Sequence, residues 1–198
     1  MDLLVVGLGN PGPEYEGTRH NIGAVAVELL VARHHGSLAA EKGLRARAGQ
    51  IRIGDHPVLC AVPLTYMNDS GLAVAPLVRR AGIDGSGGDP PAVSRLVVVH
   101  DELDLPSGRV KVKAGGGTAG NNGLKSIHTH LHTGDYLRVR IGIGKPPGRQ
   151  PGADYVLKRP GKEERESLAV AAEVAADAVE LIATVGAEAA MNRVNTAE

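Results

Sequence analysis

The fold is decided by the stretch Leu3-Leu4-Val5-Val6-Gly7-Leu8-Gly9-Asn10-Pro11-Gly12. An apolar run that ends in glycines is typical of a strand buried on both faces. The spaced glycines also match the dinucleotide-binding pattern, but that pattern needs a helix to begin at once. Here Pro11 and Pro13 intervene, helical spacing begins only near Asn21, and no ribose-binding acid stands near His34. The stretch therefore predicts a central strand and not an NAD or FAD site.

Strand and helix patterns alternate through the rest of the chain. Strands are predicted at 44–53, 57–62, 95–100, 109–113 and 137–143, the first two forming a hairpin around 54–56. Helices are predicted at 21–35, 70–81, 122–132 and 162–194, with Pro76 expected to kink or interrupt the second. Residues 82–91 and 145–153 are expected to be loops. Without a repeat or a linker, this order predicts one α/β domain over residues 1–198, with a twisted mixed, mostly parallel sheet flanked by helices.

The composition is that of a globular protein with an aliphatic core. The chain of 198 residues has no Phe, no Trp and only four Tyr. Its single cysteine, Cys60, lies in an apolar run, which predicts core packing and excludes an internal disulfide. No apolar run approaches the roughly 18 residues of a membrane helix, and the start lacks the basic residues of a signal peptide. We therefore expect a cytoplasmic protein that is not embedded in a membrane.

The net charge is zero, but the charges are unevenly distributed. Residues 105–145 contain seven basic residues and one acidic residue, and residues 161–198 contain eight acidic and three basic ones. One interpretation is two differently solvated faces. The other is a basic patch that attracts phosphate groups, as in proteins that bind nucleic acids.

Other ligand-binding patterns in the chain are incomplete. Leu124 stands where a phosphate-binding loop needs a glycine before Lys125. His128 and His132 are spaced to share a metal, but no second set of ligands matches them, which favours a partly exposed helix face. The acids at 101–104 could hold Mg²⁺. The chain has no Gly-x-Ser-x-Gly elbow, which argues against a serine hydrolase. We expect no metal and no cofactor.

Polar residues follow the predicted strands and share one topological position. Asn10, Asn68, Asp101 and Asn122 each come after a strand, and His20 precedes the first helix. If the strands are parallel, these residues emerge at one carboxyl edge, where α/β folds place their sites.

These residue types suit ester hydrolysis. A histidine can take a proton from water, a carboxylate can hold and stabilise its imidazole, and amides can bind a peptide or a developing oxyanion. Structural roles stay open at this point, because Asn122 could cap its helix, Asn10 and Asn68 could be turn residues, and His20 and Asp101 could bind backbone.

At these segments the sequence closely resembles the bacterial-type peptidyl-tRNA hydrolases. The blocks that carry the resemblance are Gly7 to Gly12 with Tyr15 and Thr18 to Gly23, then Pro63 to Gly71, His100 to Gly108, and Gly115 to Ile127 with Arg138 to Gly144. The resemblance spans most of the chain, to about Leu157.

The resemblance implies a monomeric, metal-independent enzyme that releases tRNA and peptide from peptidyl-tRNA that has left the ribosome prematurely. It implies that His20 is the base and that Asp101 orients and polarises it. The substrate-binding residues that it implies are Asn10, Tyr15, Tyr66, Met67, Asn68 and Asn122. Lys113 and Arg140 match positions that contact tRNA phosphate.

The chain departs from the family pattern at two places. The family usually has His where this chain has Asn121, in Gly120-Asn121-Asn122-Gly123, and a common Phe is replaced near Lys158-Arg159-Pro160. The alternative function is a non-catalytic RNA-binding relative, as in plastid intron-splicing factors. The presence of His20, Asp101 and the three asparagines favours the enzyme.

Overall fold

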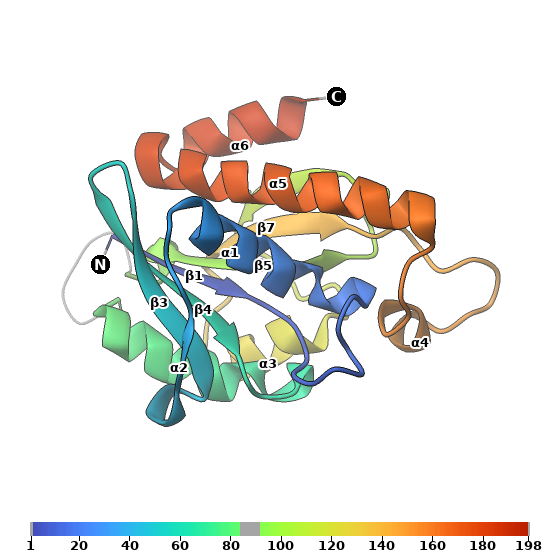
Figure 1. The fold of residues 1–198 in the computed structure, drawn as a ribbon, viewed down its shortest axis with the longest axis horizontal. Helices are drawn as coiled ribbons and strands as arrows, with labels where there is room; N and C mark the ends of the chain where they lie inside the picture. Colours follow the sequence, from blue (N-terminus) through green and yellow to red (C-terminus); the bar gives the residue numbers. More distant parts are fainter. Residues whose placement is uncertain (1, 84–91, 198) are drawn as a thin grey trace.

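The computed structural model describes residues 2–83 and 92–197, which form a seven-stranded sheet between two layers of helices (Figure 1). Its strands are β1 (Leu3–Gly7), β2 (Ala39–Glu41), β3 (Ala46–Ile53), β4 (His56–Pro63), β5 (Leu96–Glu102), β6 (Val110–Ala114) and β7 (Leu137–Gly142), in the order β2-β3-β4-β1-β5-β7-β6. The four central strands β4, β1, β5 and β7 are parallel. The predicted α/β class and mixed, mostly parallel sheet are confirmed.

Helices cover both faces of this sheet. They are α1 (Ile22–Arg33), α2 (Ser70–Ala81), α3 (Asn122–Leu131), α4 (Gly152–Val156), α5 (Lys162–Val185) and α6 (Ala187–Thr196), with short 3-10 turns η1 (Arg19–Asn21), η2 (Lys42–Leu44), η3 (Met67–Asp69) and η4 (Ala92–Arg95). Figure 1 shows α5 and α6 on one side of the sheet with α1, and α2 with α3 on the other.

Side chains of β1 pack into the hydrophobic clusters on both faces of the sheet. Along β1, Leu3 and Val5 pack in the cluster under α1, α5 and α6, while Leu4 and Val6 pack in the cluster over α2 and α3. Successive side chains of a strand point to opposite faces, so a strand covered on both sides must be apolar throughout. Cys60 on β4 is fully buried, and burial raises the pKa of its thiol to about 12, which confirms the predicted core position.

Two outer segments of the sheet run against the parallel centre. The predicted hairpin is present, with β3 antiparallel to β4, and the short strand β2 extends it. The edge strand β6 is antiparallel to β7, with Ala114 opposite Leu137 at the start of β7. The assumption that the strand before Asn122 ends at the common carboxyl edge was therefore wrong. The chain returns to that edge only through the loop between β6 and α3.

Two helix predictions need correction. The last helix was predicted to run unbroken over 162–194, but it divides at Gly186, where φ is +87°. A left-handed φ ends the helix and lets α6 turn back onto β6, where Asn195 exchanges two hydrogen bonds with the backbone of Val112. Of the kink or interruption predicted at Pro76, the interruption is wrong, because α2 continues through this residue.

The remaining loop predictions have separate outcomes. The loop predicted over 145–153 is present, and α4 begins at its end. Most of the loop predicted over 82–91 lies outside the described residues. Within the described part of the chain, no helix combines the length and the apolar character needed to cross a membrane.

Candidate active site

Close contacts between backbones place His20 beside the end of β5. His20 lies in η1, directly before α1. In the first turn of α1, a Cβ on Gly23 would stand 2.2 Å from the carbonyl oxygen of Val99, and one on Gly7 would stand 2.4 Å from the carbonyl oxygen of Gly23. Only glycine allows this approach of the helix to β1 and β5. The approach brings η1 to the carboxyl edge of the sheet, where Asp101 is the last residue but one of β5.

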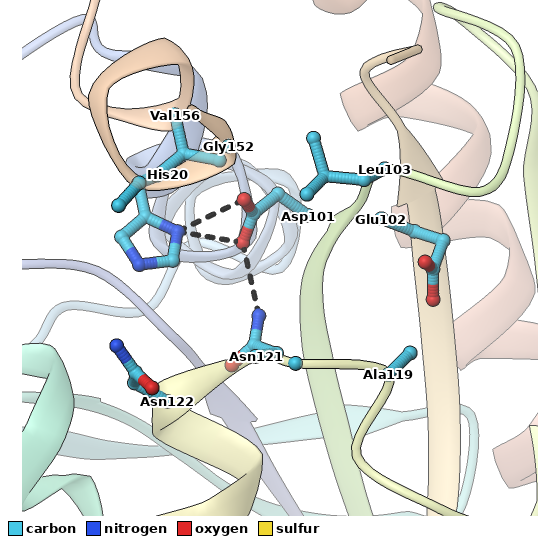
Figure 2. A pocket seen from close by; sticks show the side chains of 11 residues that line it. His20, Asp101, Glu102, Leu103, Ala119, Asn121, Asn122, Gly152 and Val156 are labelled. Carbon is cyan, nitrogen blue, oxygen red and sulfur yellow. Dashed lines mark hydrogen bonds and ion pairs between the residues drawn. The ribbon is translucent and has the colours of Figure 1, made fainter. Parts of the chain in front are cut away.

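His20 and Asp101 form a buried pair. The Nδ1 atom of His20 lies 3.0 Å and 2.9 Å from the two carboxylate oxygens of Asp101, as Figure 2 shows. The two residues are 8% and 4% exposed. Because a carboxylate only accepts hydrogen bonds, Nδ1 carries the hydrogen and Nε2 presents its lone pair. In Figure 2 this second nitrogen points away from Asp101, toward the side where Asn122 lies.

A second histidine, His100, lies in β5 next to Asp101, and its side chain is buried. His100 is 1% exposed and its Nδ1 donates to the carbonyl oxygen of Asp101 at 2.7 Å. Burial lowers the pKa of His100, so that the neutral imidazole is favoured. Its place in the strand explains why His20, and not His100, is the histidine available to a substrate.

The loop after β1 is tied to η1 and η3 by side-chain amides. The amide hydrogen of Asn10 donates to Oδ1 of Asn21, and Nδ2 of Asn21 donates to the carbonyl oxygen of Asn10, both at 2.9 Å. Oδ1 of Asn10 accepts from the backbone N–H of Met67 at 2.7 Å. Asn21 was given no role from the sequence, although it stands in the block around His20.

The predicted substrate-binding residues line one cavity of about 470 Å³. Its lining includes His20 together with all six of them, namely Asn10, Tyr15, Tyr66, Met67, Asn68 and Asn122. The rings of Tyr15 and Tyr66 meet edge to face with their centroids 6.2 Å apart. Ala153, Val156 and Leu157, from α4 and its end, complete the wall.

A smaller cavity of about 200 Å³ adjoins the same histidine. It shares His20 and Asn122 with the larger cavity, and Asp101, Glu102 and Asn121 also line it. Asn121 is the N-cap of α3, since its Oδ1 accepts from the backbone N–H of Leu124 at 3.1 Å. The capping role considered for Asn122 was therefore wrong. The side chain of Asn122 is exposed in the cleft instead.

Comparison with known proteins identifies this arrangement. A family model described as peptidyl-tRNA hydrolase matches residues 4–198. The chain belongs to the peptidyl-tRNA hydrolase family. It is 51% identical over 192 residues to peptidyl-tRNA hydrolase of Nocardia farcinica, covering 97% of this chain and 95% of that protein. The protein of the same name from Rhodococcus jostii is 49% identical, with 97% of each chain covered.

The fold agrees with a solved structure of the family. Peptidyl-tRNA hydrolase from Acinetobacter baumannii superposes with a TM-score of 0.89 at 35% identity, covering 99% of this chain and 95% of that chain. The resemblance first seen in four sequence blocks is thereby confirmed, for the family and for the fold.

Where the family's common Phe is replaced, polar contacts hold the segment to the site. Arg159 donates to the carbonyl oxygens of Glu16 and Pro13, at 2.8 Å and 3.2 Å. Arg19, next to His20, forms a bidentate pair with Glu164 of α5, and its guanidinium lies 4.1 Å from the ring centroid of Tyr155. These contacts fix η1 between α4 and α5. No role for Arg19 was predicted from the sequence.

Some basic side chains of residues 105–145 are engaged in contacts within the protein. Arg138 is buried and donates to the carbonyl oxygens of Gly116 and Gly117. Arg140 donates to Glu102 at 3.0 Å. Lys113 is exposed on the edge strand β6 and forms no ion pair among the described residues. Of the two residues predicted to contact phosphate, Lys113 is therefore the more available.

The alternative metal sites find little support in the geometry. Within residues 2–83 and 92–197, no three His, Cys, Asp or Glu side chains gather as a metal would require. Glu102 accepts from the backbone N–H of Asp104 at 3.0 Å as well as from Arg140. His130 and His132 are exposed, which confirms the partly exposed helix face.

Proposed function

We propose that this protein hydrolyses the ester of peptidyl-tRNA and releases peptide and tRNA, with His20 as general base and Asp101 as its partner. The observation that carries the proposal is the His20–Asp101 hydrogen bond, which leaves Nε2 free beside a cleft lined with amides. Membership of the peptidyl-tRNA hydrolase family supplies the substrate.

The proposed reaction needs one water molecule and no cofactor. Nε2 of His20 takes a proton from water as its oxygen attacks the carbonyl carbon that joins the peptide to the ribose. The resulting imidazolium is stabilised by the Asp101 carboxylate. The bond from that carbon to the ribose oxygen then breaks, and the imidazolium returns its proton to the leaving oxygen. The products are a peptide with a free carboxyl group, which loses its proton to solvent, and a tRNA with a free terminal hydroxyl.

The neighbouring side chains are assigned to binding. Amide groups of Asn10, Asn68 and Asn122 hold the peptide backbone, the tRNA 3′ end and the attacking water, since all three line the cleft with His20. A donor placed at the developing oxyanion contributes on the order of 10²–10³ in rate. Tyr15, Tyr66 and Met67 form the apolar wall. A monomeric state and a cytoplasmic location remain predictions from the sequence and the resemblance.

The direct test is hydrolysis of an N-acetylated aminoacyl-tRNA by the purified protein. Release of the N-acetylated amino acid, with the tRNA left intact, is the expected result. Spontaneous ester hydrolysis without protein is the control. Tight binding of the tRNA with no release above that control would instead favour the non-catalytic RNA-binding relative.

Replacement of Lys113 by alanine tests the phosphate contact. We expect weaker tRNA binding and a plot of log affinity against log salt whose slope is shallower by about 0.7–0.9, because one phosphate contact is lost. The measurement is the dissociation constant at several salt concentrations. Lys162→Ala is the matched control, since Lys162 is an exposed lysine at the start of α5. An unchanged slope in Lys113→Ala would contradict the contact.

A further inference from the structure

Asn121 bridges the start of α3 and the buried carboxylate of the site. Its Nδ2 donates to Oδ1 of Asp101 at 3.3 Å, while its Oδ1 accepts from the backbone N–H of Leu124 (Figure 2). We propose that Asn121 is a positioning residue, which holds Asp101 and through it His20 in the geometry needed for catalysis. The proposal rests on the proposed function, because it concerns the same pair of residues.

The cap fixes which way the amide of Asn121 points. Its oxygen is committed to the N–H of Leu124, so the NH₂ group is the end that faces Asp101. A carboxylate that is 4% exposed has lost most of its water and depends on donors for its charge. Asp101 receives two such donors, Nδ1 of His20 and Nδ2 of Asn121. Nδ1 of His20 lies near both carboxylate oxygens and Nδ2 of Asn121 near Oδ1, so the carboxylate is held from two sides.

A capping role alone does not account for the second hydrogen bond. A cap needs only one oxygen acceptor, which serine or aspartate supplies as well as asparagine. The donor to Asp101 is specific to the amide, and its effect extends to the next residue. Because Asn121 joins the first turn of α3 to β5, it also sets where Asn122 stands beside His20.

The amide differs in one chemical respect from the histidine that is usual in the family. An amide neither gains nor loses a proton over the working pH range, so its donation to Asp101 is constant. The titratable groups that line the two cavities with His20 are Asp101, Glu102, Asp69, Tyr15 and Tyr66, and α4 contributes none. Asn121 therefore adds no titration of its own to the pH–rate profile.

Two variants separate capping from positioning. Asn121→Ser keeps a capping oxygen but is too short to reach Asp101. Asn121→Asp keeps the cap and replaces the donor by a second carboxylate. We expect Asn121→Ser to lower kcat about tenfold with KM nearly unchanged. Asn121→Asp should lower kcat similarly and move the acid limb of the pH–rate profile, because two carboxyl groups this close share a proton whose loss is coupled to that of the imidazolium.

The readouts are kcat and KM between pH 5 and 8, the thermal midpoint, and the NMR titration of the His20 imidazole. Asn121→His, which introduces the usual family residue and can also donate to Asp101, should keep most of the wild-type kcat. Wild-type kcat and an unmoved acid limb in both Asn121→Ser and Asn121→Asp would overturn the proposal. If the wild-type protein lacks hydrolase activity, the proposed function fails, but the NMR titration still decides whether Asn121 acts on His20. An unmoved titration in Asn121→Asp would then overturn the positioning role separately.

Discussion

Replacement of His20 by alanine is expected to lower kcat for acylaminoacyl-tRNA by about 10²–10⁴-fold, the usual contribution of a general base. The reason is that Nε2 is the one imidazole nitrogen directed into the cleft, held there by the bond from Nδ1 to Asp101. Binding of tRNA should change little, because the predicted phosphate contact, Lys113, lies on β6. The measurement is single-turnover release of the acylated amino acid by saturating enzyme.

The His20→Ala protein should still fold, which its unfolding free energy and a control variant can check. His20→Ala leaves Asp101 buried without its main donor, which should cost about 1–3 kcal/mol of unfolding free energy. His56→Ala is the matched control, since His56 begins β4 at the opposite edge of the sheet and its side chain is 41% exposed. Full turnover by a folded His20→Ala protein would remove His20 from the mechanism.

Much of the site was predictable because the ends of apolar strands can be located in the sequence. β1, β4 and β5 are buried runs followed by polar residues, and parallel neighbours must end at one edge. Asn10 and Asn68 follow β1 and β4, and Asp101 lies at the end of β5, so their meeting with His20 needed only the strand directions. The residue types then indicated hydrolysis, and the family resemblance supplied the substrate.

The parts that were missed depend on contacts between distant segments. Asn121 and Asn122 are adjacent and both suit a helix cap, and periodicity locates a helix boundary only to within a few residues. The direction of β6 is likewise set by pairing with β7, and not by its own alternating pattern. Gly186 interrupts an alanine-rich segment that favours helix on both sides. The break lets α6 turn back and Asn195 bind β6, a contact that the local sequence pattern does not reveal.

Replacement of Asp101 by asparagine removes the charge of the catalytic pair with little change in shape. An asparagine Oδ1 can still accept from His20 and Asn121, but its NH₂ group takes the place of Oδ2, which lies 2.9 Å from Nδ1 of His20. Two donors then face each other, which favours the imidazole tautomer with the hydrogen on Nε2. The negative charge that stabilises the imidazolium is lost as well. We expect kcat to fall by about 10²–10⁴-fold, the contribution of a general base, with the tRNA dissociation constant nearly unchanged.

The pH dependence of kcat should also shift in a defined direction. Without the carboxylate, the protonated imidazole is less stable, so the acid limb of log kcat should move to lower pH in Asp101→Asn. Asp101→Ala, which removes the acceptor as well, should lower kcat further, because the imidazole is then no longer held with Nε2 toward the cleft. A folded Asp101→Asn protein that keeps wild-type kcat would show that the charge of Asp101 does not take part in the reaction. Weaker tRNA binding in that variant would instead give Asp101 a role in substrate binding.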